Sequence, residues 1–243
     1  MPGYAGLSPL VAPLVSAGYV LVPAATAHTA LGLEPAALAA LRPAWERLPA
    51  DAYLRDGGRY RARRHSCFTQ TPAGGLLERV AHRAHWQPTA YNALHGGLER
   101  WFEPIEAVVS AAPVWRQLLG ALGAVFAAVR PVERWFIEAH QFRIDTAHGI
   151  GRPTPEGAHR DGVDFVAVVL VARGELQGGE TRVFDASGST GVRFTMHEPW
   201  SMLLMDDARV IHETTPIRSR DGRGVRDTLV LTYRAGGFQA PAG

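Results

Sequence analysis

The sequence predicts one α+β domain with a mainly β core, spanning residues 1–243. Two observations support this fold class. Residues 131–236 contain short alternating segments separated by Gly, Pro and acidic turn residues, as in a β-barrel or β-sandwich. Residues 1–130 instead contain apolar residues at helical spacing. With 47% hydrophobic residues, the chain can bury a sizeable core. We therefore expect a helix-rich N-terminal part packed on a C-terminal β core.

In the N-terminal part, residues 1–30 are expected to be loop-rich, with a short strand in the segment GYVLVP (18–23). The most clearly defined helix follows Pro113, because proline is favoured at a helix start and the apolar residues after it share one face. Helices are expected over 34–48, 76–84, 97–111 and 113–129.

In the C-terminal part, aromatic and β-branched residues alternate with polar ones, which is typical of half-buried strands. The mainly apolar segment VDFVAVVLVA (163–172) follows a polar, turn-rich segment. The expected strands cover residues 132–145, 164–172, 181–186, 191–196, 200–205, 208–213 and 227–234.

Composition excludes several function classes. The chain has no lysine, which excludes Schiff-base chemistry and the P-loop lysine. Cys67 is the single cysteine, so cysteine-rich metal sites and disulfides within one chain are impossible, and we expect a small buried side chain there.

The formal net charge is only +2, and the one basic run is 59–65, which argues against nucleic-acid binding. Without a signal segment or membrane span, a cytoplasmic location is expected.

A metal site in this chain must therefore use histidines and carboxylates. His159 and Asp161 lie two residues apart, a spacing that places both side chains on one face of a strand. His212 follows the apolar segment WSMLLM and supplies a third donor. Two histidines and one carboxylate suit non-heme Fe(II), a zinc hydrolase uses the same donors, and ordinary hydrogen-bonded surface residues are the simplest alternative.

Arg226 and Thr228 open the last long strand and again share one face. A guanidinium beside a hydroxyl is a good receptor for a carboxylate, although most arginines lie on the surface. The combination of the three metal-ligand candidates with this pair favours a functional site.

The chain resembles the iron- and 2-oxoglutarate-dependent dioxygenases, and within them the bacterial hydroxylases of free L-amino acids of the L-isoleucine 4-hydroxylase type. The resemblance covers roughly residues 60–235. It rests on QPTAYNALHGGLERWFEPIE (87–106), HQFRI (140–144), PEGAHRDGVDFV (155–166), GGETRVFD (178–185), LLMDDARVIHETTPI (203–217) and RDTLVLTYR (226–234).

This resemblance implies a double-stranded β-helix (jelly-roll barrel) and the cofactors Fe(II), 2-oxoglutarate and O2. It implies His159, Asp161 and His212 as iron ligands, and Arg226, assisted by Thr228, as the anchor for the distal carboxylate of 2-oxoglutarate. The implied reaction hydroxylates a C–H bond and forms succinate and CO2. Related halogenases lack the carboxylate ligand, so Asp161 favours hydroxylation.

A free amino acid in a closed pocket needs partners for its carboxylate and its ammonium. Arg143 is the first candidate for the carboxylate, and Asp164 is a candidate for the ammonium. Segments 59–65 and 87–92 are expected to form part of a lid. The remaining candidate contacts are Gln141, Arg61, Gln87 and Asn92.

Other histidines are expected to have structural or solvent-facing roles, namely His65, His148 and His197. Two further functions stay open. The same chemistry would suit a protein residue or a larger biosynthetic intermediate, and a non-catalytic 2-oxoglutarate or metal sensor would use the same fold.

Overall fold

The computed structural model describes residues 4–92 and 94–241. Its largest element is a seven-stranded antiparallel sheet in the order β1-β9-β5-β12-β4-β2-β3. The strands are β1 (Tyr19–Val22), β2 (Arg61–Thr71), β3 (Leu76–Arg79), β4 (Trp135–Asp145), β5 (Phe165–Arg173), β9 (Met202–Asp206) and β12 (Val225–Arg234). The longest strands, β2, β4 and β12, lie side by side within this sheet.

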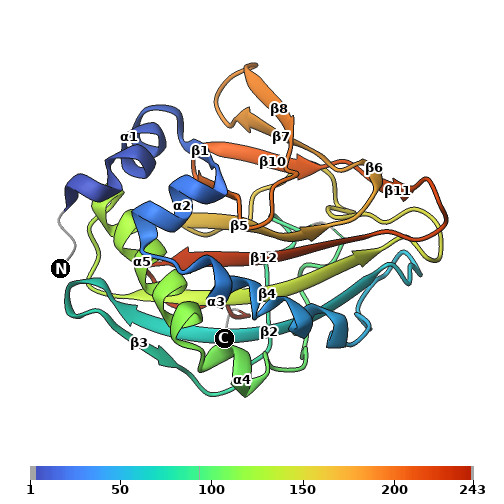
Figure 1. Cartoon of the computed structure of the whole chain (residues 1–243), viewed down its shortest axis with the longest axis horizontal. Coiled ribbons are helices and arrows are strands. Elements are labelled where there is room, and N and C mark those ends of the chain that lie inside the picture. The colour runs from blue at the N-terminus through green and yellow to red at the C-terminus, as the bar shows by residue number, and fades with distance from the viewer. Residues whose placement is uncertain (1–3, 93, 242–243) are drawn as a thin grey trace.

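A second, smaller sheet has the order β10-β7-β8, and a two-stranded ribbon pairs β11 with β6. These strands are β6 (Leu176–Gly178), β7 (Glu180–Asp185), β8 (Gly191–Thr195), β10 (Val210–Thr214) and β11 (Ile217–Ser219). Figure 1 shows the smaller sheet above the large one, with the helices over the other side of the large sheet. This arrangement is the expected double-stranded β-helix.

The helices are η1 (Tyr4–Leu7), α1 (Ser8–Ala17), α2 (Ala24–Leu31), α3 (Pro35–Ala39), η2 (Arg42–Arg47), η3 (Pro72–Gly74), α4 (Ala107–Ser110) and α5 (Pro113–Val129). The longest, α5, lies over the large sheet (Figure 1). Its buried residues belong to the main core, together with Trp135 and Tyr233 of the sheet. None of the helices in the described part of the chain has the length and apolar character needed to span a bilayer.

The alternation of side chains along β12 separates the core from the cavity. Leu229, Leu231 and Tyr233 pack into the main core with the helices. Arg226, Thr228 and the other residues of even number line a cavity between the two sheets. One strand therefore contributes both to the main core and to a polar pocket, because neighbouring side chains point to opposite faces.

Several sequence-based expectations for the N-terminal part are wrong. Residues 4–31 form α1 and α2 around β1 and are not loop-rich. The helix expected over 34–48 is broken into α3 and η2, and Pro43 lies in the first turn of η2. Proline lacks the N–H that a continuous α-helix needs at this position.

Two further expected helices do not form. Residues 76–84 begin with the strand β3, which pairs with β2. Residues 97–111 are irregular except for α4. The basic run 59–65, expected in a lid, leads into β2, which pairs with β4 inside the large sheet. Tertiary pairing overrides local helical propensity here. The helix over 113–129 and the seven C-terminal strands lie where the pattern places them, within a few residues.

Candidate active site

His159 and His212 meet across an isolated antiparallel bridge between the PEGAHRDG segment and β10. Each backbone N–H donates to the other residue's carbonyl oxygen at 3.0 Å. Directly paired residues place their side chains on the same face, and the two ring centroids are 4.6 Å apart. The backbone pairing therefore brings together two imidazoles that are far apart in the sequence.

Asp161 completes a group of three donor atoms that lie within 4.8 Å of one another. Its Oδ1 is 3.9 Å from His159 Nε2, and its Oδ2 is 3.8 Å from His212 Nε2. His159 Nδ1 lies 2.9 Å from the Gly157 carbonyl oxygen, which fixes the ring and leaves Nε2 directed toward the group. The donor set, two imidazole nitrogens and one carboxylate, fits a first-row divalent metal such as Fe(II).

Asp207 holds the backbone that carries Asp161. Its carboxylate accepts hydrogen bonds from the backbone N–H groups of Asp161, Gly162 and Val163, at 3.0, 2.8 and 3.1 Å. Burial and the nearby Asp161 charge raise the pKa of Asp207 to about 6. Asp207 was not among the residues expected at the site, although it directly follows β9 in the segment LLMDDARVIHE.

Burial and nearby carboxylates set the pKa values of the two histidines in opposite directions. It lowers the pKa of His212 to about 3, so this imidazole is neutral and offers a lone pair at neutral pH. Burial also acts to lower the pKa of His159, but the carboxylates of Asp161 and Glu156 outweigh it and raise that pKa. A nearby concentration of negative charge is the environment that a divalent cation neutralises.

Arg226 lines the same cavity and is only 4% exposed. No hydrogen bond or ion pair joins its guanidinium to a residue in the described ranges. Burial, and after it the charge of Arg173, lower its pKa to about 10, so it remains a cation at neutral pH. Thr228 lies on the same strand face and also lines the cavity. A buried, unpaired guanidinium is costly to keep, and a bound carboxylate offsets that cost.

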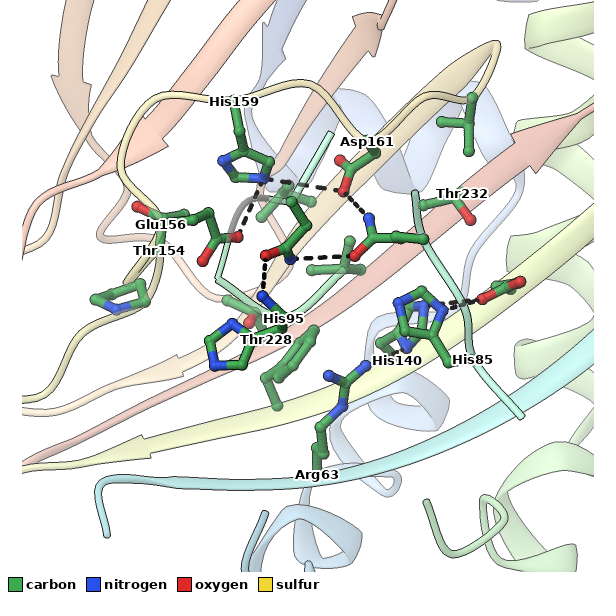
Figure 2. Close-up of a pocket in the computed structure, with 18 of the residues that line it drawn as sticks. Arg63, His85, His95, His140, Thr154, Glu156, His159, Asp161, Thr228 and Thr232 are labelled. Carbon is green, nitrogen blue, oxygen red and sulfur yellow. Dashed lines mark hydrogen bonds and ion pairs between the residues drawn. The ribbon is translucent and has the colours of Figure 1, made fainter. Parts of the chain in front are cut away.

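Three of the expected substrate contacts line this cavity, namely Arg61, Gln87 and Asn92. Gln87 Nε2 donates to Asp161 Oδ1 at 3.2 Å, and Gln87 Oε1 accepts from Asn92 and Arg100. Segment 87–92 therefore contacts the candidate metal-ligand group through Gln87. Figure 2 shows His159 and Asp161 of that group in the same pocket. Arg61 is paired with the buried carboxylate of Asp51 at 2.7 Å.

The other three expected contacts do not reach the cavity. Arg143 forms a two-point ion pair with Asp227, at 2.8 and 2.7 Å, on the face of the sheet that is turned away from the cavity. Gln141 shares that face of β4, where residues of odd number pack toward the helices, and it is fully buried. Asp164 pairs with Arg130 and accepts from the Ala235 backbone N–H. The cavity-facing side of β4 is therefore the even-numbered one, and not the face that carries Gln141 and Arg143.

The residues on the correct face of β4 are Glu138 and His140, with His85 opposite them. They form a buried group with His65, which was expected to have a structural or solvent-facing role and is fully buried. The alternation of HQFRI contained the signal, since His140 and Phe142 share one face. The sequence does not indicate which face looks inward.

Comparisons with known proteins agree with this geometry. Residues 42–232 match the family model described as 2OG-Fe dioxygenase. A bsmA homolog from Methylobium petroleophilum PM1, known from its crystal structure, is 56% identical, with a TM-score of 0.93 over 98% of this chain and 96% of its own. Among curated proteins, none matches the chain.

More distant structures share the fold. IDO from Bacillus thuringiensis is 17% identical, with a TM-score of 0.78 over 94% of this chain and 99% of its own. The Fe(II)/(alpha)ketoglutarate-dependent dioxygenase TqaL is 18% identical, with a TM-score of 0.71 over 95% and 88%. The match of the family model to most of the chain and the 56% identity to the bsmA homolog show that this protein belongs to the 2OG-Fe dioxygenase family, the 2-oxoglutarate-dependent non-heme iron oxygenases.

Proposed function

We propose that this protein hydroxylates a C–H bond of a small molecule, with a free L-amino acid as the substrate class. His159, Asp161 and His212 would hold Fe(II), and Arg226, assisted by Thr228, would bind the distal carboxylate of 2-oxoglutarate. The observation that carries the proposal is the buried Arg226, which pairs with none of residues 4–92 and 94–241, in the cavity that also contains the group of three metal-ligand candidates.

When bound, iron and 2-oxoglutarate activate O2 for insertion of one oxygen atom into a C–H bond, with succinate and CO2 as coproducts. The chain's own residues provide orientation. The backbone pairing of His159 with His212 aligns two donors, and Asp207 fixes the third through the backbone of residues 161–163. Gln87 donates to Asp161 Oδ1 and so restrains that carboxylate. Such positioning decides which C–H bond reacts.

The free amino acid is favoured because the cavity lining contains buried charges of both signs besides Arg226. Arg63 and Arg100 are cations, and Glu138 and Glu156 are carboxylates. A small zwitterion is complementary to such a lining, because each of its charged groups meets an opposite charge when it leaves water. A large apolar substrate would offer these charged groups no opposite charge and would exclude water from them.

The test reconstitutes metal-free protein with Fe(II) and 2-oxoglutarate under anaerobic conditions and monitors the visible charge-transfer band. Oxygen and the twenty proteinogenic L-amino acids are then supplied one at a time. We expect succinate formation coupled to a product that has gained one oxygen atom. His212→Ala should abolish both, whereas His197→Ala, at an exposed position, should behave as the wild type.

The result that would overturn the enzymatic proposal is bound iron without 2-oxoglutarate turnover for any substrate. Tight 2-oxoglutarate binding without turnover would indicate a sensor. Turnover on a peptide, with none on free amino acids, would replace the substrate class and keep the chemistry.

A further inference from the structure

A second buried polar group lines the cavity, formed by His65, His85, Glu138 and His140, which we call the Glu138 cluster. Glu138 Oε2 lies 2.5 Å from His85 Nδ1, 3.2 Å from His65 Nε2 and 3.5 Å from His140 Nε2. The rings of His65 and His140 stack at 4.6 Å. Three imidazoles thus surround one carboxylate oxygen.

The hydrogen bond from Arg63 to His140 decides which ring nitrogen of His140 carries the proton. Its guanidinium lies 2.7 Å from His140 Nδ1 and has only N–H donors, so His140 Nδ1 accepts. The proton of a neutral His140 is then on Nε2, directed toward Glu138. A histidine in this tautomer has no lone pair on Nε2 for a metal, and metal-ligating histidines donate their other N–H rather than accept there. The geometry is that of a hydrogen-bonded carboxylate and not of a second metal site.

The charge state of the Glu138 cluster supports the same conclusion. Burial acts to raise the pKa of Glu138, but the surrounding histidines outweigh it and hold that pKa well below its usual value. Burial lowers the pKa of His85 to about 4 and also lowers those of His65 and His140. At neutral pH the cluster is therefore one carboxylate with three neutral imidazoles.

Strand register places the Glu138 cluster at the opposite end of the cavity from Arg226. On β12, Arg226 pairs with Ile144 of β4, and Thr232 pairs with Glu138. Six residues along each strand separate these two pairs, which is about 20 Å along an extended strand. Figure 2 shows His85 and His140 on the far side of the pocket from His159. If Arg226 holds one end of 2-oxoglutarate, the Glu138 cluster lies on the side left for the substrate.

One acceptor in the Glu138 cluster lacks a partner. All three close imidazole nitrogens contact Oε2 of Glu138, and no residue of the described segments donates to Oε1. Glu138 is 6% exposed and lines the cavity. Oε1 is not among the fully enclosed polar atoms of the described residues, so it keeps surface toward the cavity, where a cationic N–H donor from a ligand can reach it.

Positive charge flanks this acceptor. Arg63 lies 3.8 Å over the ring of Phe102 and contacts His140. Arg100, which is 2% exposed, donates to Gln87, and Gln87 in turn donates to Asp161. The same end of the cavity therefore presents Glu138 Oε1, an acceptor for an ammonium, beside two guanidinium groups that suit a carboxylate. Arg100 and Gln87 connect this end to Asp161 by hydrogen bonds.

We propose that the Glu138 cluster binds the α-ammonium group of the substrate, with Glu138 Oε1 as the acceptor and Arg63 and Arg100 beside it for the α-carboxylate. This inference rests on the proposed function. It makes Glu138 and His85 specificity-determining residues that select an amino acid over a carboxylic acid of the same shape.

The experiment measures how strongly the ligand's ammonium is coupled to Glu138. Kd values are measured by anaerobic calorimetry on protein loaded with Fe(II) and 2-oxoglutarate. The probes are the L-amino acid that binds tightest among the twenty proteinogenic ones and the carboxylic acid in which hydrogen replaces its ammonium. We expect the amino acid to bind the wild type about 10- to 100-fold more tightly than its analogue, the range of a charged hydrogen bond.

In Glu138→Gln the affinity for the amino acid should fall by a similar factor, while the affinity for the analogue stays within about 3-fold. Glu133→Gln, at an exposed position, is the matched control and should change neither Kd. His85→Asn is a second variant at the cavity edge and should weaken amino acid binding in the same direction. An unchanged Kd for 2-oxoglutarate shows that each variant keeps its fold.

Equal effects of Glu138→Gln on both ligands, or no effect on either, would overturn the inference. Binding of no amino acid by wild-type protein that still binds 2-oxoglutarate would also overturn it, while leaving the metal and 2-oxoglutarate chemistry intact. Failure of the wild type to bind 2-oxoglutarate would instead refute the proposed function, and the inference with it. A second metal ion per chain, lost in Glu138→Gln, would show that the proton assignment is wrong.

Discussion

At the scale of single residues, the site depends on side chains that are buried before any ligand arrives. Arg226 keeps its charge although burial lowers its pKa to about 10, and no described residue pairs with it. Arg61, in contrast, is neutralised by Asp51 in the same cavity wall. Of these two arginines, Arg226 is therefore the one that is free to bind an anionic ligand.

Replacing Arg226 tests this role directly. Arg226→Gln should weaken 2-oxoglutarate binding by about 10- to 100-fold, because a charged hydrogen-bonded pair is lost. Arg226→Lys should recover part of the affinity, since it restores the charge without the planar two-point contact. The measurement is the Kd of 2-oxoglutarate in the presence of Fe(II). Arg193→Gln, at an exposed position, serves as the control. A change below 3-fold in Arg226→Gln would rule out the anchor.

At the scale of elements, α5 and β2 contact each other through glycines. Gln70 of β2 donates to the Gly120 carbonyl oxygen of α5 at 2.8 Å. A Cβ on Gly123 would lie 1.7 Å from Gln70 Oε1, whereas a Cβ on Gly120 would come no closer than 3.9 Å to Gln70. The absence of a side chain at position 123 allows the helix to approach the strand.

The two glycines therefore predict opposite effects on stability. Gly123→Ala should lower the free energy of unfolding by about 1–3 kcal/mol, because Gln70 is buried and hydrogen-bonded and must move. Gly120→Ala should raise it by up to about 1 kcal/mol, since alanine favours the helix and has room. Urea denaturation of both variants against wild type measures this. Stabilisation by Gly123→Ala would mean that the helix and strand are less closely packed than described.

At the scale of the whole molecule, the buried histidines link stability to pH. The folded-state pKa of His85 is lowered to about 4, below its ordinary value near 6.5. Between these values the unfolded chain binds more protons than the folded one, so stability falls as the pH falls through this window. His65 and His140 act in the same direction because burial lowers their pKa values too.

We expect metal-free protein to lose about 1 kcal/mol from His85 alone between pH 7.5 and pH 5.5, with further loss from the other two histidines. Urea denaturation at both pH values gives this difference. His85→Gln should reduce the slope, because it removes one of the proton-linked groups. His197→Gln is the exposed control. Asp207 and His159, whose pKa values are raised, change stability in the opposite direction over this range. The comparison between variants is therefore decisive: an equal pH dependence in the wild type and His85→Gln would contradict the burial of a neutral imidazole at position 85.

The same contrast between local pattern and tertiary contact explains which expectations were correct. Strands at 164–172 and 227–234 were predictable because their alternation reflects burial on one face of a sheet. Residues 76–84 were not, because residues 76–79 pair with the last four residues of β2, 68–71. Local propensity alone does not reveal such a partner.

The sequence alone singled out His159, Asp161, His212 and Arg226 as candidates, through their residue types and spacing together with the resemblance to a known family. Only the tertiary structure decided which face of β4 looks into the cavity, and so replaced Arg143 and Gln141 by Glu138 and His140 as candidate substrate contacts. The physical reason is that alternation divides a strand into two faces without labelling them. The packing of helices on one face, and of a second sheet on the other, decides which face meets the substrate.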